Sequence, residues 1–307
     1  MNSSEDESSP SKQDILFQLV IEGKSKEVRR FLLSEESISI DFKDESGNTA
    51  LIYAATYDRL ELAKILIERG ADVNKKNKCG NTAFLFAASQ GNLDFVQLLL
   101  ERDAKLDAAN TCGTGALHFA SLGGHMNLVK YLVERGCNIN RVDCERKTPS
   151  MYAASKGYVG IVGYLIDCGA SLNVQDMRGW TCLFYAVSQG YRAVVQILTE
   201  RGVDVNVTDL HGRSALMFCS HCNIALHLIT HGSQVNLKDN HGMTALMYAV
   251  AQGHFDLTKL LLAKGADANA QNEYGESALI IASMRGHDSI AALLLRCKSI
   301  DLNVACG

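Results

Sequence analysis

The chain has 307 residues, of which 47% are hydrophobic and 21% are charged, and its formal net charge at pH 7 is -4. This composition is typical of a folded protein with a buried core, and the small negative charge gives no general attraction to nucleic acids, so long nucleic acid is not an expected partner. No apolar stretch reaches the roughly 18 residues that a membrane span needs, so we expect no membrane insertion. The ten cysteines are too irregularly spaced for a disulfide framework, which favours a cytoplasmic or nuclear protein with reduced thiols.

The first residues differ in character from the rest of the chain. Residues 1–13 are polar and acidic, without apolar periodicity, and are expected to form a disordered tail. Ser9 precedes a proline and is a possible phosphorylation site, although such a pair also occurs often by chance. Two helical patterns follow, over 14–20 and 28–33, and are interpreted as an N-terminal cap.

A nine-residue segment recurs along nearly the whole chain, beginning with Gly-Asn-Thr-Ala-Leu-Ile-Tyr-Ala-Ala at Gly47. Successive copies lie 33 residues apart except for one step of 30, from Gly212 to Gly242. Each copy is followed by a run whose apolar residues share one stripe of a helix, and then by a glycine and a polar loop. The pattern predicts two short helices and a finger-like loop in each repeat. Because one such pair cannot bury its own apolar stripe, the repeats must stack.

With this period, a Gly-x-Thr-x-Leu start and a Gly-Ala-Asp-Val-Asn end, the chain resembles the ankyrin repeat family, although only Pro149 and His118 keep the family's proline and histidine. The resemblance implies an all-α solenoid, an ankyrin-repeat stack of helix-turn-helix units with β-hairpin-like fingers, about nine including the cap. We expect a single domain over residues 14–304. Its expected repeats are 14–43, 44–76, 77–109, 110–142, 143–175, 176–208, the shortened 209–238, 239–271 and 272–304, with 305–307 beginning an incomplete finger.

The shortened repeat contains a possible zinc motif, in which Cys219 and Cys222 precede His227 and His231. The ligand types and the spacing within each pair suit zinc, but only four residues separate the pairs where a zinc finger has about a dozen. In the repeat register Cys219 replaces a small core alanine and His231 takes an exposed position. We therefore expect no metal and no cofactor. The missing residues predict instead a shortened first helix and a local change of curvature around residues 212–225.

Two recurring rows of residues are interpreted as structural. An Asp or Asn stands three positions before each glycine, where its oxygen can accept backbone N–H groups within the turn. This row consists of Asp44, Asn77, Asn110, Asp143, Asp176, Asp209, Asp239 and Asn272. An aromatic row recurs on the first helices and is expected to be core rather than a stacking ladder. It consists of Tyr53, Phe86, Phe119, Tyr152, Tyr185, Phe218 and Tyr248.

The positions that flank each glycine change along the chain. They are small or charged in the first repeats, but large, aromatic or basic from the fifth repeat onward, and such residue types concentrate in interface centres. The resemblance implies that partners bind the concave face of fingers and first helices. The candidate binding residues are Met177, Arg178, Trp180, Leu210, His211, Arg213, His241, Met243 and Tyr274, extended by Gln189, Gln252 and Arg285 at the ends of first helices.

Two other interpretations of these residues stay open. Neighbouring fingers would pack Trp180 and Met177 against one another, which would make them structural. Alternatively, Trp180 would stack on a small phosphate or nucleotide ligand whose charge Arg178 and Arg213 neutralise.

No nucleotide-binding loop, zinc-protease helix or nucleophile elbow occurs in the sequence, so we expect a non-catalytic scaffold that binds an unidentified partner protein. The alternative is the recognition module of a larger effector, an enzyme, channel or ubiquitin-ligase adaptor, because the sequence stops inside a further finger after the apolar run 291–295. In ankyrin-like proteins finger asparagines can be substrates of an asparaginyl hydroxylase, which the resemblance extends to Asn74 and Asn206.

Overall fold

The computed structural model describes residues 11–35 and 38–297. The chain divides into two units, residues 1–144 and residues 145–307, and each is described by itself. Within the described residues the regular structure is helical, apart from three isolated β-bridges between finger residues. The all-α repeat architecture expected from the sequence is confirmed.

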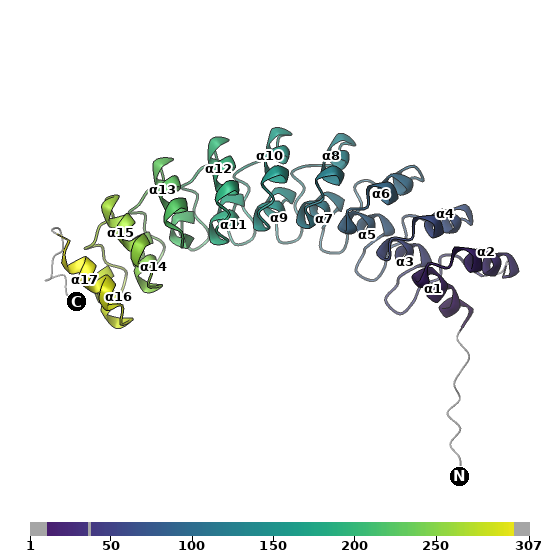
Figure 1. Ribbon diagram of the computed structural model, residues 1–307, viewed down its shortest axis with the longest axis horizontal. Coiled ribbons are helices and arrows are strands. Elements are labelled where there is room, and N and C mark those ends of the chain that lie inside the picture. Colours follow the sequence, from purple (N-terminus) through teal and green to yellow (C-terminus); the bar gives the residue numbers. More distant parts are fainter. Residues whose placement is uncertain (1–10, 36–37, 298–307) are drawn as a thin grey trace, which may run out of the picture. The chain divides into compact units, whose positions relative to one another are not determined.

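Unit 1 contains four pairs of antiparallel helices (Figure 1). They are α1 Lys12–Glu22, α2 Ser25–Ser34, α3 Ala50–Thr56, α4 Leu60–Glu68, α5 Ala83–Gln90, α6 Leu93–Leu100, α7 Ala116–Gly123 and α8 Met126–Glu134. The first helix begins two residues earlier than expected, because the Ser11 hydroxyl accepts the Asp14 N–H and the Asp14 carboxylate accepts the Ser11 N–H. Residues 11–13, assigned to the tail from the sequence, therefore belong to α1 and its cap, while residues 1–10 lie outside the described residues.

Unit 2 continues the same pattern with one exception, a 3-10 helix in place of one first helix. Its elements are α9 Pro149–Ser155, α10 Val159–Asp167, α11 Cys182–Ser188, α12 Arg192–Glu200, η1 Ala215–Phe218, α13 Cys222–Thr230, α14 Ala245–Ala251, α15 Phe255–Ala263, α16 Ala278–Met284 and α17 Asp288–Leu295. The longest described helix, α1, has 11 residues, and no described helix is long and apolar enough to cross a membrane.

The first helices are buried on most sides, whereas the second helices cover them with one apolar stripe. Neighbouring first helices pack directly, α3 on α5 and α5 on α7, and within each unit the second helices lie side by side. Alanines at the centre of the first helices, such as Ala54 and Ala87, are fully buried and allow this close approach. Most first helices begin after a threonine or serine whose hydroxyl accepts an N–H in the first turn, as Thr49 does from Ile52 at 3.3 Å.

Adjacent fingers are joined by one backbone hydrogen bond each. The first residue after each Asp or Asn of the finger row donates its N–H to a carbonyl on the preceding finger. In unit 1 the donor and acceptor pairs are Lys78 with Ser46, Thr111 with Cys79, and Cys144 with Cys112. In unit 2 they are Met177 with Glu145, Leu210 with Arg178, Asn240 with His211, and Glu273 with His241. Every one of these N···O distances is between 2.8 and 3.1 Å.

The shortened repeat has the short first helix that the sequence predicts. Its η1 spans only four residues, whereas the other first helices of unit 2 span seven, and α13 follows after three residues. The turn that separates the helices elsewhere, Gln189-Gly190 in the preceding repeat, has no counterpart here. The expected change in curvature stays a prediction.

Glycine is favoured where one finger touches the next, although Arg146 takes the equivalent position with φ +62°. Gly179 has φ +81°, and a Cβ there would lie 2.7 Å from the backbone N of Leu210. Gly202 has a similar φ, +79°, but a Cβ there would meet nothing within 4 Å. Both positions carry the strain of a left-handed backbone for any other residue, about 1–2 kcal/mol, while only Gly179 adds a clash with a neighbouring repeat.

We therefore expect Gly179→Ala to lower the free energy of unfolding at least about twice as much as Gly202→Ala, which costs roughly 1 kcal/mol. Chemical denaturation of the two variants and the wild type measures the difference. Equal losses for the two variants would show that contact between fingers does not require glycine at residue 179.

Candidate functional site

The fingers hold their outermost residues in fixed positions by means of a short side chain. Asp209 Oδ1 accepts the N–H groups of His211 and Arg213, both at 2.9 Å. The equivalent oxygens make the same kind of bond in Asp44, Asn77, Asn110, Asp176, Asp239 and Asn272. The structural interpretation of this row is confirmed. Because the turn is fixed from inside, the two residues that follow each Asp or Asn lie at the tip of the finger.

The tips of unit 2 carry large apolar side chains in water. Met177 is 60% exposed, Leu210 is 68% exposed and Tyr274 is 69% exposed, although residues of these types are usually buried. Met177 and Leu210 lie on adjacent fingers, which the Leu210 N–H joins through its 3.1 Å bond to the Arg178 carbonyl. We call Met177, Leu210, His211, His241 and Tyr274 the fingertip band. At the positions of Met177 and Leu210, the first three fingers of unit 1 have Glu45, Lys78 and Thr111.

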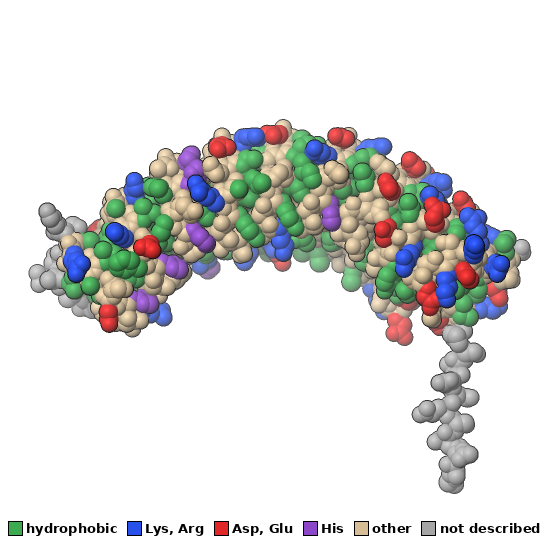
Figure 2. Space-filling model, viewed as in Figure 1, with side chains coloured by type: hydrophobic (Ala, Val, Ile, Leu, Met, Phe, Trp, Pro, Cys, Tyr) green, Lys and Arg blue, Asp and Glu red, His purple; other side chains and the backbone are tan. Residues whose placement is uncertain are grey.

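The band is also rich in imidazole groups. Seven of the nine histidines of the chain lie between residues 211 and 287, and Figure 2 shows purple side chains gathered at the surface in the region of α13 to α16. His211 and His241 are exposed on adjacent fingers. His241 Nδ1 lies 2.6 Å from Glu273 Oε1, which orients that ring. The band therefore combines apolar surface with groups that both donate and accept hydrogen bonds.

Trp180, the most conspicuous candidate from the sequence, is half-buried in an aromatic cluster. Its ring centroid lies 5.8 Å from that of Phe184, 5.4 Å from Tyr185 and 5.1 Å from Phe218. The Arg178 guanidinium lies 4.5 Å from the same ring. These contacts leave the ring little free face, so the structure gives no support to stacking of a nucleotide on Trp180. Its packing partners are aromatic side chains of first helices, and Met177, on the same finger as Trp180, is exposed.

Arg213 is another sequence candidate with a role inside the protein. Its Nη2 and Nε lie 2.7 and 2.9 Å from Oδ2 of Asp209, whose side chain is fully buried. The guanidinium also lies 4.6 Å from the centroid of the Phe218 ring. Burial raises the pKa of Asp209, but the hydrogen bonds and charge of Arg213 outweigh burial, and the net pKa is lowered. Arg213 thus neutralises a buried carboxylate.

At three other Asp residues of the finger row, a tyrosine hydroxyl donates a hydrogen bond to the carboxylate. The hydroxyl of Tyr185 donates to Asp176 Oδ2 at 2.7 Å, and that of Tyr248 donates to Asp239 Oδ2 at the same distance. In the sequence each Asp of the row has tyrosine nine residues later, except Asp209, and each Asn has phenylalanine or isoleucine. Asp209 has Phe218 at that place, and Arg213 substitutes for the missing hydroxyl.

The exposure of the side chains corrects the interpretation of the aromatic row as core. Six of its seven members are only half-buried, and Tyr185 alone is buried. The hydroxyls of Tyr53, Tyr185 and Tyr248 bond finger carboxylates, so these side chains connect the first helices to the fingers. The Asp-Tyr spacing was present in the sequence and was the signal that sequence reasoning missed.

The ends of the first helices extend the fingertip surface. Gln189, Gln252 and Arg285 are all exposed, and Gln252 Oε1 lies 2.9 Å from His254 Nε2. Arg285 and Met243, which is half-buried, are brought together at a hollow of about 120 Å³. Met284 lines the same hollow and is 69% exposed, although sequence reasoning did not select it. The other full-length repeats of unit 2 have serine or alanine at this position, so comparison of the repeats would have found it.

The possible zinc residues occupy separate places in the repeat. Cys219 is buried after η1, and its Sγ donates to the His221 carbonyl at 3.2 Å, while Cys222 is half-buried at the start of α13. His227 is half-buried, and its Nε2 lies 2.7 Å from Thr199 Oγ1. His231 is exposed, as expected. Within residues 11–35 and 38–297, no three His, Cys, Asp or Glu side chains are grouped to hold a metal ion.

The two candidate hydroxylation sites are held in place by bonds to the next finger. The Asn74 amide donates to the Asp103 carbonyl at 3.0 Å and accepts the Lys105 N–H at 2.9 Å. Asn206 makes the equivalent bonds to Gly232 and Gln234. A hydroxylase would have to break both bonds to reach either side chain, and modification stays a prediction. Ser9 lies outside the described residues.

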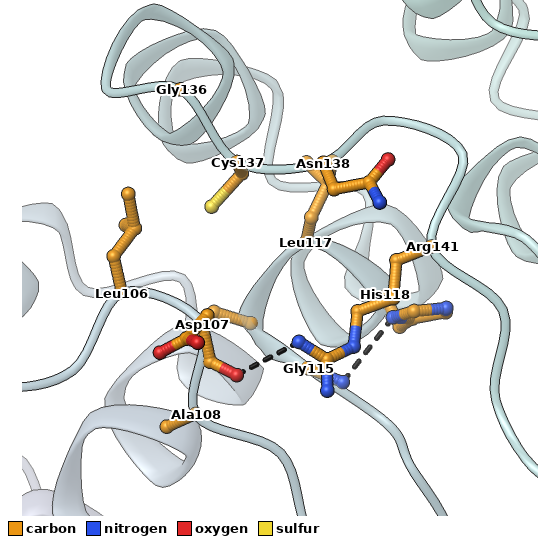
Figure 3. Close-up of a pocket in the computed structure, with 11 residues that line it drawn as sticks. Leu106, Asp107, Ala108, Gly115, Leu117, His118, Gly136, Cys137, Asn138 and Arg141 are labelled. Atoms are coloured by element: carbon orange, nitrogen blue, oxygen red, sulfur yellow. Dashed lines mark hydrogen bonds between the residues drawn. The ribbon is translucent and has the colours of Figure 1, made fainter.

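Unit 1 contains a cavity of about 240 Å³ beside one finger (Figure 3). Where most repeats have threonine at the start of the first helix, this repeat has Gly115, and the missing side chain leaves space. His118 Nδ1 accepts the Gly115 N–H at 3.2 Å, and Arg141 donates to the Asp107 carbonyl at 2.8 Å across the cavity rim. The cavity follows from glycine at this position, and we assign no ligand to it.

The partnership of Asp209 and Arg213 predicts a rescue. Arg213→Asn leaves a buried carboxylate without its cation and is expected to lower the free energy of unfolding by about 2 kcal/mol. Adding Asp209→Asn recreates the combination of Asn77, Asn81 and Phe86 in unit 1, and is expected to restore more than half of the loss. Urea denaturation of the single and double variants tests this. Exposed Arg192→Asn is the control, and a double variant no more stable than Arg213→Asn would contradict the pairing.

The tyrosines that bond finger carboxylates predict a loss of stability in alkali. Burial and the hydrogen bond to Asp239 raise the pKa of Tyr248 to about 12, above the roughly 10 of an unfolded tyrosine. Since the raised pKa favours the folded state only while the hydroxyl keeps its proton there, this contribution is complete below pH about 10 and is lost as the pH rises towards 12. Tyr248→Phe should therefore lose less stability than the wild type between these pH values. Identical pH profiles would exclude this role, and exposed Tyr57→Phe is the control.

Two family models match the chain. One, described as ankyrin repeats (3 copies), matches residues 117–209, 150–239 and 215–306, and the other, described as ankyrin repeats (many copies), matches residues 51–100 and 87–133. A search of curated proteins gave no match. The matches run together from residue 51 to residue 306, and their repeat corresponds to the helix pairs and fingers described above. The chain therefore belongs to the ankyrin repeat family.

Proposed function

We propose that this protein is a non-catalytic scaffold that binds a partner protein through the fingertip band of unit 2. Ankyrin repeats are generally modules of protein-protein interaction. The observation that carries the proposal is the exposure of Met177, Leu210 and Tyr274 on fingers whose backbones are fixed. Exposed apolar side chains of this size favour association, because binding removes them from water.

The fingers are suited to binding because they are ordered before a partner arrives. The finger carboxylates and the bonds between fingers hold the tips in place. Association with a partner therefore loses little backbone conformational entropy. Tyrosine and methionine are types that interface centres favour, and the neighbouring histidines can pair with polar groups of the partner. The ends of the first helices, with Met284 and Arg285, provide a continuation of the same surface.

Some residues near the fingertip band hold the fingers in place and are not proposed to contact the partner. Trp180 and Arg213 support the fingers through the aromatic cluster and Asp209, and Arg178 bonds the Tyr185 hydroxyl at 3.0 Å. Their replacement would disturb the fingers themselves. A test of binding therefore has to replace exposed residues that do not hold the fingers in place.

The test begins with a photoreactive amino acid in place of Leu210, which is expected to crosslink the partner in cells. The same amino acid in place of Lys78, the equivalent position in unit 1, is the control and is expected to crosslink no partner. The affinity of the purified partner is then measured for the triple variant Met177→Thr, Leu210→Thr, Tyr274→Ser. These changes introduce residues that unit 1 has at the same finger positions, Thr111 and Ser46. Because central apolar contacts often contribute more than 1 kcal/mol each, we expect binding to weaken by at least roughly tenfold.

A matched control replaces three exposed apolar residues outside the fingers, in Leu33→Thr, Leu226→Thr and Phe255→Ser. This variant is expected to bind like the wild type, and circular dichroism and thermal unfolding show whether both variants remain folded. Unchanged affinity in the fingertip variant, or an equal loss in the control, would overturn the proposal.

A further inference from the structure

Three cysteines lie at the tips of three consecutive fingers of unit 1. Cys79 and Cys112 take the same position on adjacent fingers, and Cys144 takes the preceding position on the next finger. All three are exposed to solvent. In unit 2 the equivalent positions carry the fingertip band and contain no cysteine.

The backbone brings two of these cysteines together. The N–H of Cys144 donates to the carbonyl of Cys112 at 2.8 Å. Given the lengths of the bonds that join these atoms to the two Cα atoms, the Cα atoms lie within roughly 7 Å of each other. The finger is also packed closely here, since a Cβ on Gly113 would lie 3.3 Å from the Asp143 Cα. Disulfide bonds span Cα separations of about 4.4–6.8 Å.

The third cysteine is one residue further away. The bond between the first two of these fingers joins the Thr111 N–H to the Cys79 carbonyl, so it is Thr111 and not Cys112 that lies against Cys79. Cys137, the other cysteine of this repeat, is half-buried, and burial raises its pKa to about 11. It therefore remains a thiol at neutral pH.

We propose that Cys112 and Cys144 form a reversible disulfide when the protein meets a peroxide. One thiolate attacks a peroxide oxygen, the O–O bond breaks, and a sulfenic acid and one water result after proton transfer. The second thiolate attacks that sulfur and displaces the oxygen as a second water. Overall, two thiols and one hydrogen peroxide give one disulfide and two waters. The two sulfur atoms together lose two electrons, which the peroxide gains, and a small dithiol reverses the reaction.

This disulfide would add a covalent link between two fingers that a backbone hydrogen bond joins in the reduced protein. It would close a covalent loop through the repeat that contains α7 and α8, which restricts opening of that repeat. It would also remove two thiols from the tip surface of unit 1. The site is separate from the fingertip band, and the inference does not rest on the proposed partner binding.

The experiment uses the full chain, reduced, desalted and treated with hydrogen peroxide, followed by alkylation of the remaining thiols and tryptic digestion without reduction. Trypsin places the three cysteines in different peptides, residues 79–102, 106–130 and 142–146. Mass spectrometry is expected to find 106–130 joined to 142–146, and dithiothreitol is expected to release both peptides. Cys112→Ser and Cys144→Ser should each abolish the joined pair, while Cys79→Ser should leave its yield unchanged.

Two results would overturn the proposal. One is preferential joining of the peptides that contain Cys79 and Cys112. That result would mean that cysteines at the same position of adjacent fingers react faster than the pair joined by the Cys144 N–H bond. The other is oxidation of Cys112 and Cys144 to sulfinic or sulfonic acids without a joined pair. The peptide containing Cys168, exposed in unit 2, measures how fast an isolated thiol reacts in the same sample.

Discussion

The structure depends on one short hydrogen-bonded turn, repeated in each finger, in which a single Asp or Asn oxygen accepts backbone N–H groups. This oxygen satisfies donors that would otherwise face the neighbouring finger without partners, and it holds the glycine-containing turn in shape. With the turn fixed, the next N–H points at the preceding finger and makes the bond between repeats. Packing of the helices buries the apolar surface, but this turn sets the spacing at which the fingers meet.

The choice between Asp and Asn has consequences further along each repeat. An amide is neutral and can be placed beside phenylalanine, as Asn77 and Phe86 show, whereas a carboxylate removed from water needs a donor or a cation. Tyrosine provides that donor for Asp176 and Asp239, and arginine provides it for Asp209. Arg213 and Trp180 look most like a binding site in the sequence. Arg213 instead pairs with the buried charge of Asp209, and Trp180 packs in the aromatic cluster.

Most of the architecture could be predicted from the sequence because a 33-residue period constrains every repeat in the same way. The short first helix at η1 followed from the missing residues, and the role of the finger row followed from the recurrence of Asp and Asn. The surroundings of Trp180 could not be predicted, because they depend on how Phe184 and Phe218 from successive repeats meet in space. The early start of α1 was missed because capping by Ser11 involves residues before the apolar pattern begins.

The four-residue helix η1 has a consequence for the way unit 2 unfolds. In a linear stack each repeat is stabilised through its two neighbours, and η1 packs on α11 and α14 with about half the length of an ordinary first helix. A helix of four residues closes few internal hydrogen bonds, so its order depends on packing against these two neighbours. Amide hydrogen exchange should therefore be faster in η1 than in α11 or α14, the full-length first helices on either side of it.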